Sequence, residues 1–558
     1  MKQLELTEAG WTAAASNVSA AVFLRIVSFQ SNRNCRILSP EEETVLLTST
    51  GDAWTMMQMS SRSRSGGVLL GLACALLVLQ ALPWFSGRWV EDESWYSIRA
   101  WTLLTEGRIR NVTFAETDRQ FEYDASPPGM PLVLAAAFKT GGVGVWQARL
   151  PSLLAACGLV VLVFYLGTEL GGPLLGGLAA LLVASDNFLF LAARCVRPEA
   201  LVTFLGTLAI LLYFMAKRHR SVWLSFASGV ALGCSMNMHV NGLPAALSIA
   251  SLMIAEFRLT VWRQPRAWAA ALGIALCALP TAYAAVTTPA YAKTISGVYG
   301  GYSGLSLSDK LARETQRYGE FLGLVRPGKG IPYRVPLRAH VAVLAGAAFL
   351  VLYRRNRELC VRLLILLLPV IPWWAFMVNK SARYLVLASP YIALAMAAAA
   401  ISLYHVKWRP RVVTALLLVF AGTQLAGNAL LVNRFRLADY SEVARKLRTA
   451  IPDGASATGN IVFWLALYDH PYTSYVRSPF EYTVGVRKPT YWILNDRVMV
   501  QGDGTDDADT FAGLRAQSQA LVAQQGELVA RIPSSFYGDL QVYRVHYGDQ
   551  PPLGRLRR

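Results

Sequence analysis

Residues 68–96 read VLLGLACALLVLQALPWFSGRWVEDESWY, an apolar run followed closely by acidic residues that include the adjacent carboxylates Asp92 and Glu93. The run approaches the length of about 20 residues that a helix needs to cross a bilayer. A charge held at the bilayer centre costs roughly 2.5–3.5 kcal/mol on insertion scales, so the acidic pair belongs at the membrane surface. The rest of the chain decides whether it lies in a solvated loop or in a functional site.

Composition places the chain among polytopic membrane proteins. Of its 558 residues, 54% are hydrophobic and only 16% are charged, which is too apolar for an ordinary soluble domain. The formal net charge of +18 does not indicate nucleic-acid binding. The basic residues cluster in short connectors between apolar runs, where orientation in the bilayer explains them. No CxxC pair is present and no Cys follows Cys360, so no Cys-based metal site is expected in the C-terminal region.

About eleven transmembrane helices are expected from apolar runs of near-spanning length. The runs fall at about 68–85, 147–169, 172–191, 199–216, 221–238, 242–257, 267–287, 339–353, 361–378, 384–404 and 411–431. Most alternate connectors are short and basic, as at 217–220, 354–357 and 407–411, and we expect these on the cytoplasmic side. The opposite face then holds two long outer loops, 86–146 and 288–338.

The two ends of the chain have a different composition from the membrane domain, 66–432. Residues 1–65 are polar and mixed, without the apolar core of a signal peptide, and we expect a disordered or poorly ordered cytoplasmic segment. Residues 433–558 contain no spanning run. Their patterns predict helices over 439–450 and 509–531 and strands over 460–467, 491–494, 498–500 and 541–546. We expect a small extracytoplasmic α/β domain.

Polar residues from several loops gather on the predicted outer face. They are Asp92, Glu93, Arg194, Arg197, Glu199, His239, Lys380 and Arg383. Each has an ordinary explanation when it is taken alone. The acidic pair favours a helix start, because carboxylates stabilise the N-terminal end of the helix dipole. Arg194 and Arg197 can extend to the membrane interface, and a lone His is most often a hydrogen-bonded residue at a helix end. Their convergence on one face favours a site.

The first-loop motifs resemble a known superfamily. The motifs are Asp92-Glu-Ser-Trp-Tyr96, Thr105-Glu-Gly107, Tyr123-Asp-Ala-Ser-Pro-Pro-Gly-Met-Pro-Leu132 and Trp146-Gln-Ala-Arg-Leu-Pro151, followed by Arg194-Cys-Val-Arg-Pro-Glu199 and Asn379-Lys-Ser-Ala-Arg-Tyr-Leu385. Over roughly residues 68–405 the chain resembles the protein mannosyltransferases and aminoarabinose transferases, which are GT-C fold glycosyltransferases of family 39 and its relatives. Two positions depart from the pattern. Ser126 stands where aminoarabinose transferases carry Lys, and Glu199 stands where relatives often carry Asp.

The resemblance implies an inverting transfer of a sugar from a polyprenyl-phosphate donor, with Asp92 as the catalytic carboxylate facing the acceptor hydroxyl. Such chemistry needs a base near the nucleophile and cations near the departing phosphate. Glu93 then orients Asp92, binds a metal or is solvated, and Glu199 contacts the sugar or an arginine. The phosphate ligands expected are Arg194, Arg197, Lys380 and Arg383, and the substrate contacts expected are Tyr96, Tyr123, His239 and Tyr384.

The expected partners are the donor lipid, an acceptor protein, lipid or glycan, and the inner (plasma) membrane, without nucleic acid. No cofactor is firmly implied. Carboxylates can hold a divalent metal, so that question stays open. The alternative function is a lipid or solute transporter or flippase without glycosyl transfer. Transporters place ionisable residues near the bilayer midplane and often contain internal repeats, whereas the polar residues here sit at span ends and no repeat is visible.

Overall fold

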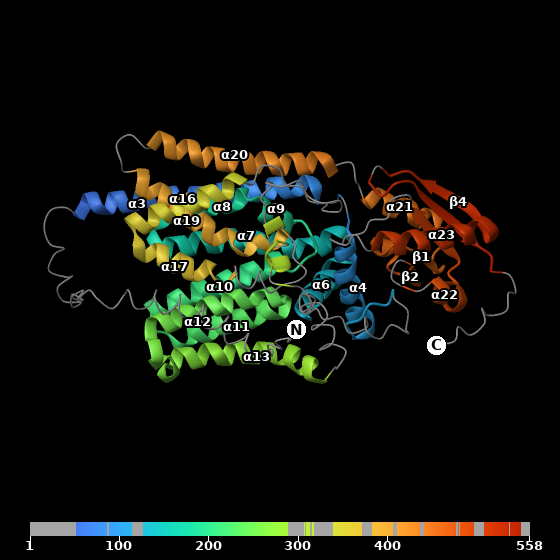
Figure 1. The fold of residues 1–558 in the computed structure, drawn as a ribbon, viewed down its shortest axis with the longest axis horizontal. Helices are drawn as coiled ribbons and strands as arrows, with labels where there is room; N and C mark the ends of the chain where they lie inside the picture. Colours follow the sequence, from blue (N-terminus) through green and yellow to red (C-terminus); the bar gives the residue numbers. More distant parts are fainter. Residues whose placement is uncertain are drawn as a thin grey trace, which may run out of the picture.

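The computed structural model describes residues 52–85, 87, 89–113, 127–287, 306, 308–312, 315–316, 339–370, 382–404, 410–435, 440–475, 478, 480–495, 507–534 and 536–547. Long helices run side by side in a bundle, and a smaller domain that contains the sheet lies at one end (Figure 1). Helices α4 (Glu91–Glu106) and α6 (Gly129–Gly141) stand across the bundle direction, between the bundle and the smaller domain.

Each predicted apolar run overlaps helical residues, and residues 371–378 of one run lie outside the described residues. The bundle helices are α3 (Asp52–Ala81), α7 (Val145–Gly171), α8 (Pro173–Ser185), α9 (Asn187–Ala193), α10 (Glu199–Arg218), α11 (Val222–Met238), α12 (Leu243–Phe257), α13 (Pro265–Thr287), α16 (Ala339–Arg355), α17 (Arg357–Leu367), α19 (Ser389–Tyr404) and α20 (Pro410–Phe435). Among the described residues, four helical segments are long and apolar enough to cross a membrane, or five if the bent pair α8–α9 is one span. Four shorter apolar helices accompany them.

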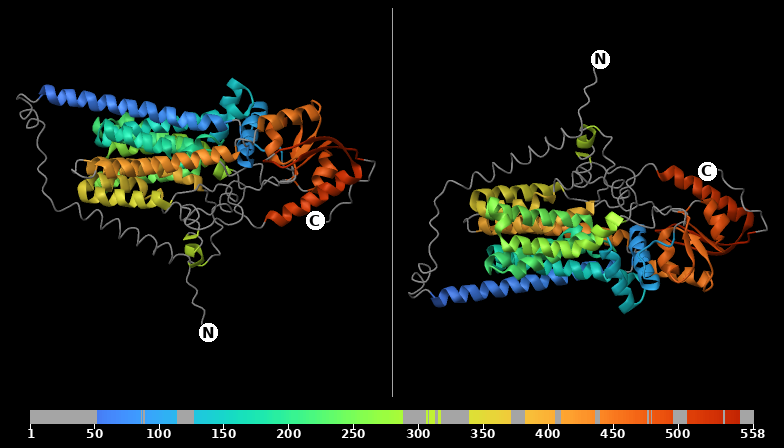
Figure 2. Two further views of the ribbon diagram at one scale, coloured as in Figure 1. Left: turned by 90° about the horizontal axis from the view of Figure 1, so that it is seen from above. Right: turned by 90° about the horizontal axis from the view of Figure 1, so that it is seen from below.

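Helix α3 begins well before the apolar run that defines the first span. It starts at Asp52 and runs along one side of the bundle, as both views in Figure 2 show. Residues 52–65, which belong to the segment 1–65 that we expected to be disordered or poorly ordered, are helical, and residues 1–51 lie outside the described residues. The stretch from Asp52 to Ser65 contains neither Pro nor Gly, so nothing in it interrupts the backbone hydrogen bonds of the helix.

The run 172–191 forms two helices rather than one. Helices α8 and α9 meet at Asp186 with a bend of 67°. Asp186 has an extended backbone, and its carboxylate accepts a hydrogen bond from the Phe188 N–H at 3.1 Å, so it caps the N-terminus of α9. The bend turns the chain so that the end of α9 delivers Arg194 to Pro198, which carry one of the predicted motifs.

Close helix contacts depend on small residues. A Cβ added at Gly129, at the start of α6, would lie 2.6 Å from the carbonyl oxygen of Asn237 on α11. A Cβ at Gly229 on α11 would lie 2.0 Å from the carbonyl oxygen of Ala270 on α13. Only glycine therefore permits these backbone approaches, as is common for packed membrane helices. Helix α6 itself lies inside the predicted outer loop and was not expected from the sequence.

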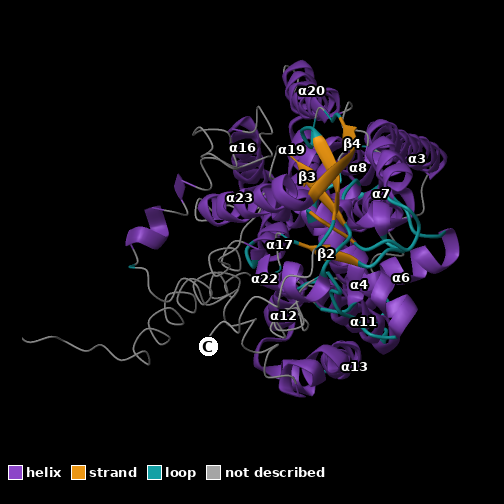
Figure 3. Cartoon of the chain, turned by 90° about the vertical axis from the view of Figure 1, so that its right-hand side faces the viewer, coloured by secondary structure: helices purple, strands orange, loops and turns teal. Residues whose placement is uncertain are grey.

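The C-terminal domain combines a mixed sheet with short helices. Its elements are α21 (Tyr440–Ala450), β1 (Ala457–Gly459), η5 (Ile461–Leu467), β2 (Tyr472–Ser474), α22 (Phe480–Tyr482), η6 (Thr483–Arg487), β3 (Tyr491–Asn495), α23 (Asp507–Gln525), β4 (Gly526–Ile532) and β5 (Leu540–Val545). The strand order is β2-β1-β3-β5-β4. β1 pairs in parallel with β2 and β3, and β5 pairs antiparallel with β3 and β4. Figure 3 views this sheet in front of the helix ends.

Some of the helices and strands predicted for this domain are confirmed and others are wrong. The helix at 439–450 and the strands at 491–494 and 541–546 are confirmed. The strand at 460–467 is wrong, because Ile461–Leu467 form a buried 3₁₀-helix whose start is capped by the Asn460 side chain. The helix predicted over 509–531 ends at Gln525, and β4 follows it. The strand predicted at 498–500 lies outside the described residues.

Candidate active site

Helix α4 carries three of the predicted site residues on its first two turns. Val90 has an extended backbone at the N-cap, and its N–H donates to the Glu93 carboxylate at 3.0 Å, which is one half of a capping box. The first turn holds Glu91, Asp92 and Glu93, where the helix dipole favours negative charge. The capping residue and the acidic first turn therefore favour a helix start at this position. Asp92 and Glu93 then meet different partners, as described next.

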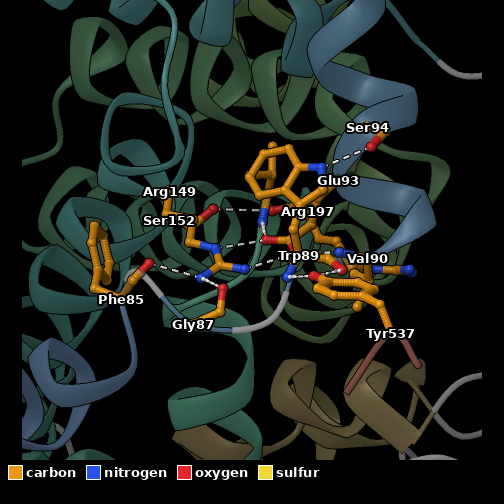
Figure 4. A network of polar contacts seen from close by, with 11 residues as sticks. Phe85, Gly87, Trp89, Val90, Glu93, Ser94, Arg149, Ser152, Arg197 and Tyr537 are labelled. Atoms are coloured by element: carbon orange, nitrogen blue, oxygen red, sulfur yellow. Dashed lines mark hydrogen bonds and ion pairs between the residues drawn. The ribbon is translucent and has the colours of Figure 1, made fainter. Parts of the chain in front are cut away.

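Glu93 is buried and forms an ion pair with Arg149 of α7 (Figure 4). The guanidinium Nε donates to Oε1 at 2.8 Å, and Nη2 donates to Oε2 at 2.9 Å. The side chain of Arg149 is 0% exposed and that of Glu93 is 1% exposed. This two-point geometry is among the strongest that a carboxylate can form. Glu93 is therefore not solvated. Arg149 lies in one of the quoted motifs, but it was not among the residues predicted for the site.

The pair joins segments that are distant in the sequence. The Val196 N–H donates to Glu93 at 3.1 Å, which connects α4 to the loop that follows α9. Arg149 also donates to the carbonyl of Phe85 at 2.7 Å and to that of Gly87 at 3.3 Å. Both oxygens of Glu93 are thus engaged by protein donors. Its contacts suit a residue that holds the first loop in place.

Arg197 lies between the other two predicted carboxylates. Its Nη1 donates to Asp92, and its Nε donates to Glu199 at 2.8 Å. Asp92 is 37% exposed at its side chain, whereas Glu199 is 2% exposed. Burial alone would lower the pKa of Arg197, but the negative charges of Glu199 and Asp92 outweigh it and raise that pKa well above its ordinary value. Arg197 therefore carries a fixed positive charge beside a carboxylate that remains accessible.

One oxygen of Glu199 has no hydrogen-bond partner among the described residues. Glu199 is the first residue of α10, and its Oε2 is buried while Oε1 accepts from Arg197. Buried polar atoms in native proteins nearly always have a partner. The arrangement leaves a buried acceptor beside the Arg197–Asp92 pair, which is where a hydroxyl or an ammonium of a ligand could donate.

Three further predicted residues surround this cluster. Tyr96 is buried, and its pKa is raised first by burial and then by Glu199, Tyr384 and Asp92, against a lowering effect of Arg197. Tyr96 is thus a neutral hydroxyl close to all of these groups. The ring centroid of Tyr384 lies 5.9 Å from that of His239. His239 accepts the Asn241 N–H at its Nδ1, at 3.1 Å, so Nε2 remains the donor of the neutral ring.

The predicted phosphate ligands are only partly described. Arg194 is 2% exposed, and its guanidinium carbon lies 5.8 Å from the Phe190 ring centroid. It is therefore buried rather than extended to the membrane surface. Arg383 belongs to the 3₁₀ turn η4 (Ala382–Leu387), but its side chain lies outside the described residues, as do Lys380 and Tyr123. No group of three or more His, Cys, Asp and Glu that could hold a metal was found in the described part of the chain.

The chain is similar to a known protein family over part of its length and to several solved structures. Residues 125–283 match the family "Dolichyl-phosphate-mannose-protein mannosyltransferase". No curated protein matches the chain. Among solved structures, ArnT from Cupriavidus metallidurans in the apo state is 14% identical, covers 86% of this chain and 98% of its own, and superposes with a TM-score of 0.59. ArnT bound to undecaprenyl phosphate is 12% identical, covers 89% and 99%, and gives 0.57.

An oligosaccharyltransferase from Archaeoglobus fulgidus, in complex with Zn and sulfate, is 14% identical and covers 76% of this chain and 68% of its own, with a TM-score of 0.53. These likenesses show the fold. The chain is a helical membrane protein with the GT-C architecture, as the motifs predicted, and with a small C-terminal domain, as the pattern of residues 433–558 predicted. It shares that fold with membrane glycosyltransferases.

Proposed function

We propose that the protein is an integral membrane glycosyltransferase that moves a sugar from a polyprenyl-phosphate donor to an acceptor hydroxyl, with inversion at the anomeric carbon. The observation that carries the proposal is the Asp92–Arg197–Glu199 cluster, which combines an accessible carboxylate, a fixed cation and a buried acceptor oxygen. It lies in a fold shared with ArnT, whose structure with undecaprenyl phosphate superposes on this chain.

Asp92 is the base in this proposal. The acceptor oxygen attacks the anomeric carbon and its proton passes to the Asp92 carboxylate, while the bond from the anomeric carbon to the phosphate oxygen breaks. Asp92 suits this role because it is the most exposed of the three carboxylates named above. A positioned general base contributes about 10²–10⁴ in rate.

Arg197 stabilises the leaving phosphate, which takes the bonding electron pair. A guanidinium has five N–H donors, and the hydrogen bonds to Asp92 and Glu199 use only two of them. The planar fork suits phosphate oxygens, and a preorganised cation lowers the barrier as charge develops on them. Arg194, Lys380 and Arg383 remain candidates for the same phosphate.

Glu199 binds the sugar through its second oxygen. The atom is buried and its carboxylate is held in place by Arg197, so a sugar hydroxyl or amino group can donate to it without displacing a protein partner. Tyr96, Tyr384 and His239 complete the wall around the sugar. Both carboxylates of the cluster already pair with Arg197, and adding EDTA to the transfer assay measures whether the reaction requires a divalent cation.

Helix α4, which carries Asp92, and the C-terminal domain occupy the same end of the bundle (Figure 1), and we propose that this end is extracytoplasmic at the inner membrane. Short basic connectors at the opposite end, such as 217–220 and 354–357, support this orientation. Reporter fusions at the two ends test it. Fusions that placed Asp92 in the cytoplasm would contradict it.

The central experiment replaces Asp92 with Asn and compares it with Glu106→Gln on the same helix. Glu106 is at the far end of α4 and pairs with Arg110 on the surface. We expect Asp92→Asn to reduce sugar transfer about 10²–10⁴-fold and to cause the lipid-linked sugar to accumulate in cells, as seen by mass spectrometry of lipid extracts. The Glu106→Gln variant should be active. Near-normal transfer by a folded Asp92→Asn protein would refute the assignment, and lipid movement without any glycosidic bond would favour the transporter.

A further inference from the structure

A tyrosine hydroxyl of the C-terminal domain forms hydrogen bonds with the first loop. Tyr537 Oη accepts a hydrogen bond from the Trp89 N–H at 2.8 Å and donates to the Trp89 carbonyl at 2.9 Å. Both residues are 0% exposed, so the contact is buried. It joins residues that lie far apart in the sequence. Trp89 precedes α4 and belongs to no helix or strand, so the tyrosine supplies the partners that secondary structure does not.

The position of Tyr537 is fixed by its own domain. Its backbone N–H donates to the Ser534 side chain at 3.1 Å. Its ring lies 5.6 Å from Phe463, 6.1 Å from Tyr440 and 5.0 Å from Phe536, measured between centroids. The hydroxyl is thus presented by a packed aromatic cluster, and it acts as a rigid point of attachment for Trp89.

Trp89 lies three residues before Asp92, and its side chain fastens the start of α4. The indole N–H donates to the Ser94 hydroxyl at 2.7 Å, and the Arg149 guanidinium carbon lies 5.5 Å from the indole ring (Figure 4). Any displacement of Trp89 therefore reaches both α4 and the Glu93–Arg149 pair. Asp92 is the neighbour of Glu93 on the same helical turn, so it moves with them.

Other contacts also hold the domain against the first loop. The Ser474 N–H donates to the Thr113 carbonyl at 2.9 Å, and the rings of Trp101 and Tyr468 meet edge to face at 5.1 Å. These contacts do not involve Tyr537. Removing its hydroxyl should therefore leave the domain docked and alter only the support of Trp89.

We propose that Tyr537 is a positioning residue for the transfer reaction, and that it acts through Trp89 to fix the start of α4 and the Asp92 carboxylate. The C-terminal domain then forms part of the catalytic unit. This inference rests on the proposed glycosyl transfer. It gives the C-terminal domain, which has no other role in the proposed reaction, one residue that supports catalysis.

The test compares Tyr537→Phe with Tyr440→Phe in the full-length protein. Tyr440 is a matched control for the hydroxyl, because its buried hydroxyl also donates to a carbonyl (Val462, 2.7 Å) and accepts from an N–H (Ala466, 3.1 Å), and both partners belong to the C-terminal domain. The ring of Tyr440, which contacts those of Trp89 and Tyr537, is kept in the Phe variant. We expect similar losses of thermal stability in the two variants. Only Tyr537→Phe should lower kcat, about 10- to 100-fold with little change in the KM for the donor lipid, because small displacements of a reacting group are costly.

Wild-type protein and the Asp92→Asn variant are assayed alongside. An inactive wild type would refute the proposed transfer itself. If the wild type is active, Asp92→Asn is inactive and Tyr537→Phe has the same kcat as Tyr440→Phe, the positioning role is overturned and the transfer reaction stands. Should Tyr537→Phe fail to fold, Ser534→Ala replaces it, since loss of the Ser534 contact loosens the turn from outside the aromatic cluster. A full kcat in Ser534→Ala would then overturn the proposal.

Discussion

Arg149→Met is the change that most directly tests how the first loop is held. The substitution preserves much of the apolar stem and removes the guanidinium, so the Glu93 carboxylate stays buried with two backbone donors and without its counter-charge. The carbonyls of Phe85 and Gly87 lose their donor as well. Removing one partner of a buried ion pair costs about 3–5 kcal/mol, since the remaining charge is uncompensated.

This cost can be measured as a shift in melting temperature. For a cooperative unit on the order of 350 residues, an unfolding entropy of about 2.1 cal/mol/K per residue converts the cost to a decrease of about 4–7 °C. Differential scanning fluorimetry of the detergent-solubilised protein measures it. Arg149→Lys should fall between wild type and Arg149→Met, because an ammonium restores the charge without the two-point geometry.

A double-mutant cycle identifies the source of the loss. Glu93→Gln alone leaves Arg149 charged and buried, and we expect a destabilisation of similar size. The double variant Glu93→Gln/Arg149→Met removes both charges, so its destabilisation should be less than the sum of the single values by about 2 kcal/mol or more. Additivity to within about 0.5 kcal/mol would show that the two side chains act independently, and the reasoning would then fail.

Three further outcomes follow from the described contacts. Glu199→Gln should raise the KM for the donor lipid more than it lowers kcat, measured in steady-state transfer assays, because its partnerless oxygen is assigned to the sugar; an unchanged KM would remove that assignment. Asn187→Leu should cost about 1–3 kcal/mol in thermal melts, since the Asn187 amide donates to the Gln424 carbonyl at 2.6 Å within the helix bundle; an unchanged melting temperature would contradict this. Gly229→Ala should also lower the melting temperature, because the new Cβ would overlap the Ala270 carbonyl and force α11 and α13 apart; equal stability would mean that the helices separate without cost.

The positions of the helices could be predicted because burial in a bilayer leaves a local signature. Continuous apolar runs mark α7 and α10 closely. The same reasoning fails where an apolar run indicates that residues are buried but does not indicate whether they form a helix or a strand. Residues 461–467 (Ile-Val-Phe-Trp-Leu-Ala-Leu) are all buried, as a strand of this composition would be, but the Asn460 side chain caps them into a 3₁₀-helix. Aromatic and β-branched content cannot distinguish the two outcomes in so short a run.

Partners across long sequence separations could not be predicted. Nothing in the sequence joins Tyr537 to Trp89, since the Tyr537 hydroxyl bonds to the backbone N–H and carbonyl of Trp89, which almost every residue possesses. Arg149 did leave a signal. It is an arginine near the start of an apolar span, and a charge in such a position must find a partner. Glu93, on the same predicted face, was available for it. Combining those two observations would have made Glu93 one of the candidate partners, beside Asp92 and Glu199.

Asp92 and Glu93 contact different arginines because of helix geometry. Consecutive residues on a helix point about 100° apart, so two adjacent carboxylates cannot meet the same neighbours. Glu93 points inward to Arg149 and uses both oxygens there, whereas Asp92 points to Arg197 and stays partly exposed. The buried carboxylate fixes the orientation of α4 and thereby the direction in which its neighbour faces. Under the proposed function, Glu93 anchors the helix and Asp92 faces the substrate, so the two carboxylates do not share one ligand.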